Sequence, residues 1–203
     1  TGQLWGNPLY DWVAMKKDGY QWWVERIKAL LNLVDYIRID HFRGFEAYWS
    51  VPAGEETAVN GKWVPGPDHD LFKAIKEKLG DIPIIAEDLG VITDGVKKLR
   101  DDFDLPGMKV LQFAFDLNEA GKEGFVNAFL PHMYSPNCVV YTGTHDNDTM
   151  QGWLNKASDE EIKLICEYIE GPGACISREN LCKKLVKLAF SSVARFAVIP
   201  MQD

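Results

Sequence analysis

The residues best suited to chemistry stand at the ends of apolar segments. Residues 34–40 are mostly apolar, yet they carry Arg38 and Asp40 two positions apart. Side chains alternate between the two faces of a strand, so Arg38 and Asp40 share a face at its carboxyl end. This segment alone leaves two interpretations open. The pair either satisfies only its own charges within the fold, or it forms the edge of a reactive site.

Two later segments end in the same way. Residues 82–88 run through an apolar stretch to Glu87, and residues 138–148 reach Asp146. A buried glutamate is rare unless it is paired or reactive. In parallel α/β architectures, and above all in closed barrels, the carboxyl ends of the strands line the site. We therefore expect Asp40, Glu87 and Asp146 to converge.

Three carboxylates at one site suit two chemistries. Their oxygens can bind a divalent cation, or they can cleave a glycosidic bond, one as nucleophile and another as acid/base. Arg38 would keep Asp40 ionised, as a nucleophile requires, while Glu87 would need a raised pKa. This favours the sugar chemistry over a metal site. Flat rings suit the apolar faces of sugars, and aromatic residues are dense around the strand ends: Trp5, Phe42, Phe45, Tyr48, Trp49, Trp63, Phe113, Phe115 and Tyr141.

Five apolar segments are the elements that must position these residues. They are rich in Val, Ile, Phe or Tyr, as strands buried on both faces should be. Helical patterns separate most of them, and this order predicts an α/β protein with a parallel sheet. The segments are residues 34–40, 82–88, 108–115, 138–145 and 196–203.

The helices between these strands have recognisable starts. Residues 20–34 carry apolar side chains at helical spacing. Asp68 and Ser177 are each expected to cap a helix. Ser158, followed by Glu161, has the pattern of a capping box.

Composition restricts the partners and the compartment. The formal net charge of -8 argues against nucleic acid or an anionic membrane as the main partner. No apolar run approaches the roughly 20 residues of a membrane span. The four cysteines form no CxxC pair, which is typical of reduced thiols in a cytoplasmic protein.

Five segments resemble one enzyme family. RIDHFRGF (38–45), IIAEDLG (84–90) and YTGTHDNDT (141–149) resemble signature segments of the 4-α-glucanotransferases, the amylomaltase or disproportionating-enzyme family of the α-amylase clan. TGQLWGNPLYDW (1–12) and LPGMKVLQFAF (105–115) resemble its flanking segments. The resemblance implies transfer of α-1,4-glucan segments between maltooligosaccharides or starch, a chemistry that requires no metal or organic cofactor.

The resemblance also implies catalytic roles. Asp40 matches the nucleophile that forms a glucosyl intermediate, and Glu87 matches the general acid/base. Asp146 matches the carboxylate that stabilises the transition state. Arg38 matches the arginine that orients and ionises the nucleophile. Retaining chemistry of this kind predicts carboxyl groups about 5–5.5 Å apart.

Four further residues match substrate-binding positions. His145 matches a histidine that hydrogen-bonds the sugar at the cleavage subsite. Gln3 and Trp5 lie in a segment that borders the acceptor side, and Phe113 matches an aromatic near the sites. Trp5 and Phe113 can also be read as packing residues.

The sequence is shorter than the barrel that the family implies. A (β/α)8 barrel typically needs about 250 residues, whereas this sequence has five strand segments in 203 residues. By resemblance they are barrel strands four to eight. Residues 1–203 are therefore predicted to be a partial (β/α)8 catalytic domain. The Gly- and Pro-rich residues 51–67 are predicted to be a functional loop.

Other functions stay open at this point. Five strands leave two open sheet edges, which invite self-association, and an incomplete barrel can bind glucan without turnover. An α-glucan hydrolase of the same clan would use the same carboxylates. A metal-dependent phosphatase is disfavoured, because the sequence has no Gly-rich phosphate cradle.

Overall fold

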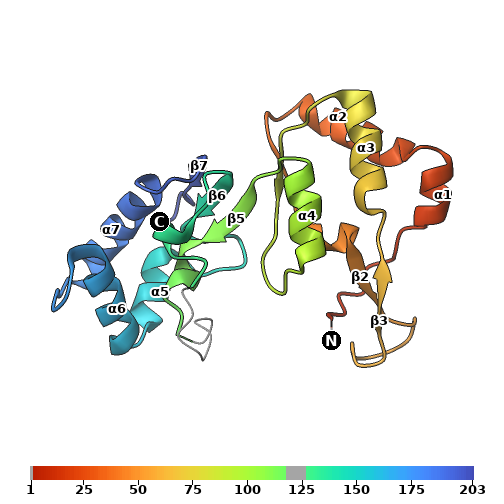
Figure 1. The fold of residues 1–203 in the computed structure, drawn as a ribbon. Helices are drawn as coiled ribbons and strands as arrows, with labels where there is room; N and C mark the ends of the chain where they lie inside the picture. Colours follow the sequence, from red (N-terminus) through yellow and green to blue (C-terminus); the bar gives the residue numbers. More distant parts are fainter. Residues whose placement is uncertain (1, 118–126) are drawn as a thin grey trace. The chain divides into compact units, whose positions relative to one another are not determined.

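The computed structural model describes residues 2–117 and 127–203. The chain forms two compact units, Thr1–Gly107 and Met108–Asp203. Figure 1 colours the first unit from red to green and the second from green to blue.

The first unit contains a parallel pair of short strands. β1 (Ile37–Ile39) pairs with β4 (Ile84–Ala86), with Ile37 opposite Ile84 and Ile39 opposite Ala86. An antiparallel pair, β2 (Ala47–Ser50) and β3 (Lys62–Pro65), follows β1 in the chain. The helices of this unit are α1 (Trp12–Lys17), α2 (Gln21–Leu31), α3 (Asp68–Leu79) and α4 (Asp94–Asp102).

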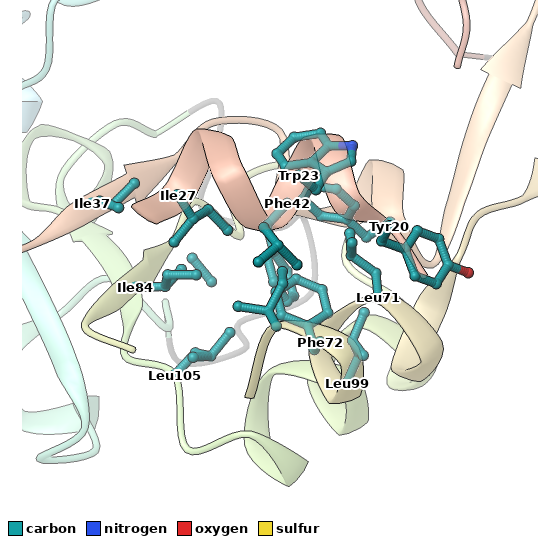
Figure 2. Close-up of a cluster of buried hydrophobic side chains, with 14 of the residues drawn as sticks. Tyr20, Trp23, Ile27, Ile37, Phe42, Leu71, Phe72, Ile84, Leu99 and Leu105 are labelled. Atoms are coloured by element: carbon teal, nitrogen blue, oxygen red, sulfur yellow. The ribbon is translucent and has the colours of Figure 1, made fainter. Parts of the chain in front are cut away.

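The core of the first unit lies between these helices and the parallel pair. Figure 2 shows Ile37 of β1 and Ile84 of β4 beside Ile27 of α2, with Phe72 of α3 in the same cluster, near Leu99. In α2 the buried residues Trp23, Val24 and Ile27 recur at helical spacing, so one face of the helix packs inward. The other large buried side chains of this core are Phe42, Leu71, Ile75 and Leu99.

The second unit has a three-stranded sheet in the order β5-β6-β7. β5 (Gly107–Val110) starts at the unit boundary, and β6 (Cys138–Tyr141) pairs in parallel with β7 (Phe196–Val198). Three helices, α5 (Met150–Lys156), α6 (Asp159–Glu170) and α7 (Arg178–Phe190), supply much of its core. Short 3-10 helices occupy Phe42–Phe45 in the first unit and Leu111–Ala114 and Pro131–Met133 in the second.

The five predicted strands are confirmed, but each is only three or four residues long. The segment 108–115 divides into β5 and the 3-10 helix Leu111–Ala114. The long connection 51–67 contains β3, a strand that the Gly- and Pro-rich composition concealed.

The capping predictions had mixed outcomes. The Ser158–Glu161 capping box is present, with both of its hydrogen bonds. Asp68 as a helix cap is wrong: it is the first residue of α3 with Pro67 before it, and its carboxylate contacts His69 instead. Ser177 stands at the N-cap of α7, but the structure gives its side chain no capping hydrogen bond. Within the described residues, no helix combines the length and apolar character of a membrane span.

Candidate active site

The register of β1 and β4 brings Asp40 and Glu87 together. Ile39 lies opposite Ala86, so the next residues in the two parallel strands are Asp40 and Glu87. The ladder continues past the strand ends, because the Glu87 N–H donates to the Ile39 carbonyl (3.0 Å) and the Phe42 N–H donates to the Glu87 carbonyl (3.0 Å). Two residues that are 47 positions apart in the chain thus project from one end of one sheet.

Arg38 and Asp40 form an ion pair on the shared face that the strand alternation predicts. The Arg38 side chain is 24% exposed and that of Asp40 is 67% exposed. A pair that existed only to satisfy buried charge would have both members covered. Here the guanidinium is mostly covered, whereas the carboxylate is open to an incoming molecule.

Glu87 has a different environment from Asp40. One of its carboxyl oxygens accepts the His41 N–H (2.6 Å) and the other accepts the Leu89 N–H (2.8 Å). Burial raises the pKa of Glu87 above its ordinary value, and the neighbouring Asp40 charge adds to the rise, while the two N–H groups and Arg38 oppose it. The predicted direction is therefore confirmed: Glu87 keeps its proton to higher pH than an ordinary glutamate does.

His41 is a site residue that the sequence analysis missed. Its backbone is left-handed (φ 48°), which is uncommon for a residue with a side chain and aims its N–H at Glu87. Burial lowers the pKa of the imidazole, Arg43 lowers it further, and Asp40 opposes them. The ring meets Trp5 edge-on, with centroids 4.7 Å apart. The partner of the His41 N–H lies 46 positions away in the sequence, so no local pattern reveals this contact.

The two predicted residues of the first segment lie at the surface. Trp5 is 56% exposed while its ring contacts that of His41, so more than half of the side chain is open to solvent. Gln3 is also exposed. The binding roles of Trp5 and Gln3 stay predictions.

A pocket of about 410 Å³ opens beside Asp40 in the first unit. Its wall combines the polar side chains of Arg38, Asp40 and His41 with apolar and aromatic surface from α1, α2, β1, the chain before α1 and the 3-10 helix Phe42–Phe45. The sequence analysis did not place Tyr10, Trp12 or Trp23 at this pocket. Trp23 belongs to the apolar face of the helix predicted over residues 20–34, and that spacing indicated only a core position. The remaining lining residues are Arg26, Ile27, Leu30, Ile37, Ile39, Gly44 and Phe45.

The residue after Glu87 is held by α4. The Asp88 side chain is only 9% exposed and pairs with Arg100, whose own side chain is 23% exposed. Gly107 lies so close that an added Cβ would be 2.6 Å from Asp88 Oδ2. The pair Asp88–Arg100 thereby fixes the chain next to Glu87.

The predicted residues of the second unit lie on two different elements. His145 and Asp146 follow β6, with His145 Nε2 3.4 Å from Asp146 Oδ1 and side chains 66% and 78% exposed. Phe113 lies on the 3-10 helix Leu111–Ala114 and packs edge-on against Phe129 (5.4 Å). The convergence of Asp146 with Asp40 and Glu87 stays a prediction.

Within residues 2–117 and 127–203, no three His, Cys, Asp or Glu side chains are grouped to hold a metal ion.

Comparisons with known proteins agree on one family. The 4-alpha-glucanotransferase family model, glycoside hydrolase family 77, matches residues 1–203. The 4-alpha-glucanotransferase of Synechocystis is 52% identical over 205 residues, which cover all of this chain and 39% of that protein. The chloroplastic/amyloplastic 4-alpha-glucanotransferase of Solanum tuberosum is 51% identical over 203 residues, and the chain covers 34% of it.

Solved structures agree as well. The amylomaltase of Streptococcus agalactiae in complex with acarbose has a TM-score of 0.87 and 36% identity, over 98% of this chain and 39% of that one. The amylomaltase of Corynebacterium glutamicum, at 16% identity, shares the fold (TM-score 0.78) over 96% of this chain and 32% of that one. The α/β fold is thus part of a (β/α)8 barrel, and the chain spans between about a third and two-fifths of the length of these relatives. Matched along its whole length, the chain belongs to the 4-alpha-glucanotransferase family.

Proposed function

We propose that this chain carries catalytic machinery for the transfer of α-1,4-glucan segments by retaining double displacement. The observation that carries the proposal is the pairing of two unlike carboxyl groups at one sheet end. Asp40 is open to solvent and paired with Arg38, whereas Glu87 is half-buried with a raised pKa. Retaining glycoside chemistry requires a carboxylate that attacks the sugar and, beside it, a carboxylic acid that donates a proton to the leaving group.

The steps follow from these two environments. Asp40 attacks the anomeric carbon while Glu87 gives its proton to the departing glycosidic oxygen. The bond to the leaving glucan breaks as the glucosyl–Asp40 ester forms. Glu87, now ionised, removes the proton from the 4-hydroxyl of an acceptor glucan, which displaces Asp40 and completes the transfer.

The remaining predicted residues support substrate in this proposal. Arg38 orients Asp40, and Asp146 stabilises the positive charge that develops on the sugar ring. His145 hydrogen-bonds the sugar, while Trp5, Gln3 and Phe113 contribute to binding. Residues 51–67 help to shield the intermediate from water. The substrates are α-1,4-glucans and maltooligosaccharides, and the acarbose bound by the Streptococcus agalactiae amylomaltase supports that class.

A second candidate follows from the length of the chain. It covers 34–40% of the curated relatives, so the same residues can bind glucan without completing turnover. A hydrolase of the same clan is distinguished by its products, because it makes only shorter sugars.

The test is incubation of the purified chain with maltotriose, with products separated by size. Asp40→Asn and Glu87→Gln are the informative variants. Asp81→Asn is the matched control, because that aspartate is 90% exposed and pairs with Lys76 at the surface. Glucans longer than maltotriose, made by wild type and control but not by the two variants, support transfer. Glucose and maltose alone indicate hydrolysis.

A folded chain that forms no products refutes catalysis by this polypeptide. Calorimetric titration with acarbose then decides whether it still binds an α-glucan analogue.

A further inference from the structure

The loop that carries His145 and Asp146 is fastened at both ends to a single side chain. Thr142 lies just before the loop and Met150, the first residue of α5, just after it. The Thr142 hydroxyl donates to Asp203 Oδ2 (2.5 Å), and the Met150 N–H donates to Asp203 Oδ1 (2.6 Å). Asp203 follows β7, and its own N–H donates to the Pro200 carbonyl (3.0 Å), which fixes the turn that presents the carboxylate.

Both ends of the loop are buried where Asp203 holds them. Thr142 and Met150 are each 0% exposed. A buried hydroxyl and a buried N–H each need a partner, because an unsatisfied polar group in the interior is costly. One carboxylate serves both, and it comes from a segment more than 50 residues away in sequence.

Other contacts hold the middle of the loop. The buried Gln112 amide donates to the Asp148 carbonyl (2.9 Å), and Lys156 pairs with the Asp148 side chain (2.6 Å). Within the loop, the Asn147 side-chain oxygen accepts the N–H (2.8 Å) and the hydroxyl (2.9 Å) of Thr144, and the Asp146 N–H donates to that hydroxyl (3.3 Å). These contacts shape the loop, but none of them joins Thr142 to Met150.

His145 and Asp146 themselves are not immobilised by packing. Their side chains are 66% and 78% exposed, and their contact with each other (3.4 Å) is long for a hydrogen bond. Their place therefore depends on the backbone of the loop, and the backbone depends on how its ends are held.

We propose that Asp203 is a positioning residue for Asp146 and His145. It acts through Thr142 and Met150, and it closes the loop in the way that a cross-link restricts a chain segment. The proposal rests on the proposed function, which gives Asp146 and His145 their part in the reaction. It deepens that function by assigning a residue that no motif for the carboxylates includes.

The test compares Asp203→Ala, Asp203→Asn and Thr142→Val with the wild-type chain. Alanine removes both contacts, and valine removes only the hydroxyl contact at nearly unchanged volume. Asparagine can keep both, because its oxygen accepts the Met150 N–H while its amide donates to the Thr142 hydroxyl. Ser158→Ala is the control, because it weakens a helix cap in the same unit without touching the loop.

Backbone ¹⁵N relaxation and amide exchange in residues 143–150 provide a readout that does not depend on activity. In wild type we expect order parameters near 0.85 at Asp146, falling below about 0.6 in Asp203→Ala and recovering in Asp203→Asn. Exchange of the Met150 amide should accelerate by at least about tenfold in Asp203→Ala, the equivalent of about 1.4 kcal/mol. Thr142→Val should lie between wild type and alanine, and amides of α6 should be unchanged in all three.

Transfer kinetics with maltotriose provide the second readout. Asp203→Ala should lower kcat by at least about tenfold with KM nearly unchanged, and Asp203→Asn should restore most of it. The proposal is overturned if the loop stays ordered in Asp203→Ala, or if Ser158→Ala loosens it equally. A wild-type chain without transfer activity would refute the proposed function, whereas the relaxation and exchange results would still decide the positioning role.

Discussion

Gly107 offers a direct test of how the chain beside Glu87 is held. A Cβ at this position would lie 2.6 Å from Asp88 Oδ2, 2.9 Å from Oδ1 and 3.0 Å from Cγ. Carbon–carbon contacts are optimal at about 3.5–4.0 Å, so Gly107→Ala forces the carboxylate to move. It cannot swing away freely, because it is almost covered and paired with Arg100.

The size of the effect follows from two opposing contributions. Inserting a methyl group into a filled space costs about 1–3 kcal/mol. Replacing glycine by alanine where the backbone permits it stabilises by about 0.4–1 kcal/mol, through the unfolded chain. Gly107→Ala should therefore lower the free energy of unfolding by about 1–2 kcal/mol. In an Asp88→Ala background the clashing atoms are gone, so the same change should be neutral or slightly stabilising.

Urea denaturation of the four chains of this double-mutant cycle is the assay. With a slope of about 2 kcal/mol per molar urea, the midpoint of Gly107→Ala should fall by about 0.5–1 M. The coupling between the two positions should exceed about 1 kcal/mol. An unchanged midpoint for Gly107→Ala, or an equal loss in both backgrounds, would refute the close approach and the role of the Asp88–Arg100 pair.

The other predictions concern charge, capping and orientation. Because Glu87 has a raised pKa when folded, the folded state holds its proton longer than the unfolded state. Wild-type stability should fall as pH rises from about 4.5 through that raised pKa, and Glu87→Gln should remove this part of the pH profile in calorimetric scans. Ser158→Ala should lower the free energy of unfolding, measured in urea, by about 1 kcal/mol. Ser177→Ala should lower it by only a few tenths of a kcal/mol, because the Ser177 hydroxyl makes no capping hydrogen bond. Equal losses in the two variants would contradict the assigned caps. Arg38→Lys keeps the charge but loses the planar fork, so kcat for transfer should fall by about a hundredfold with KM nearly unchanged. A wild-type rate in that variant would exclude an orienting role for the guanidinium.

Local pattern was sufficient for much of the fold. Apolar segments rich in β-branched residues predicted the five strands, because the burial of a strand determines the types of consecutive residues along it. The capping box at Ser158 was equally visible, since both of its partners lie within four positions. The ends of β1 and β4 also identified Asp40 and Glu87 as candidates, because charge at the end of an apolar strand stands out without knowledge of its partner.

Helix starts were less predictable where the partner of a side chain lies elsewhere. Asp68 has the residue type of a cap, yet it contacts His69, whose other ring nitrogen lies 2.7 Å from Asp102. Asp102 belongs to α4, a helix that follows much later in the chain. The choice between capping and this chain of contacts is made by packing between helices, which no short window of sequence contains.

The chemistry of the site was decided in tertiary structure. The register that sets Glu87 beside Asp40 joins residues 47 positions apart. The left-handed backbone of His41, the burial that raises the pKa of Glu87 and the reach of Asp203 to both ends of the Asp146 loop depend on contacts of the same long range. Residue types and their spacing identify the groups that can react. Burial and hydrogen bonding determine the protonation state and the orientation of these groups. Burial and hydrogen bonding of this kind arise only when segments distant in the sequence come into contact.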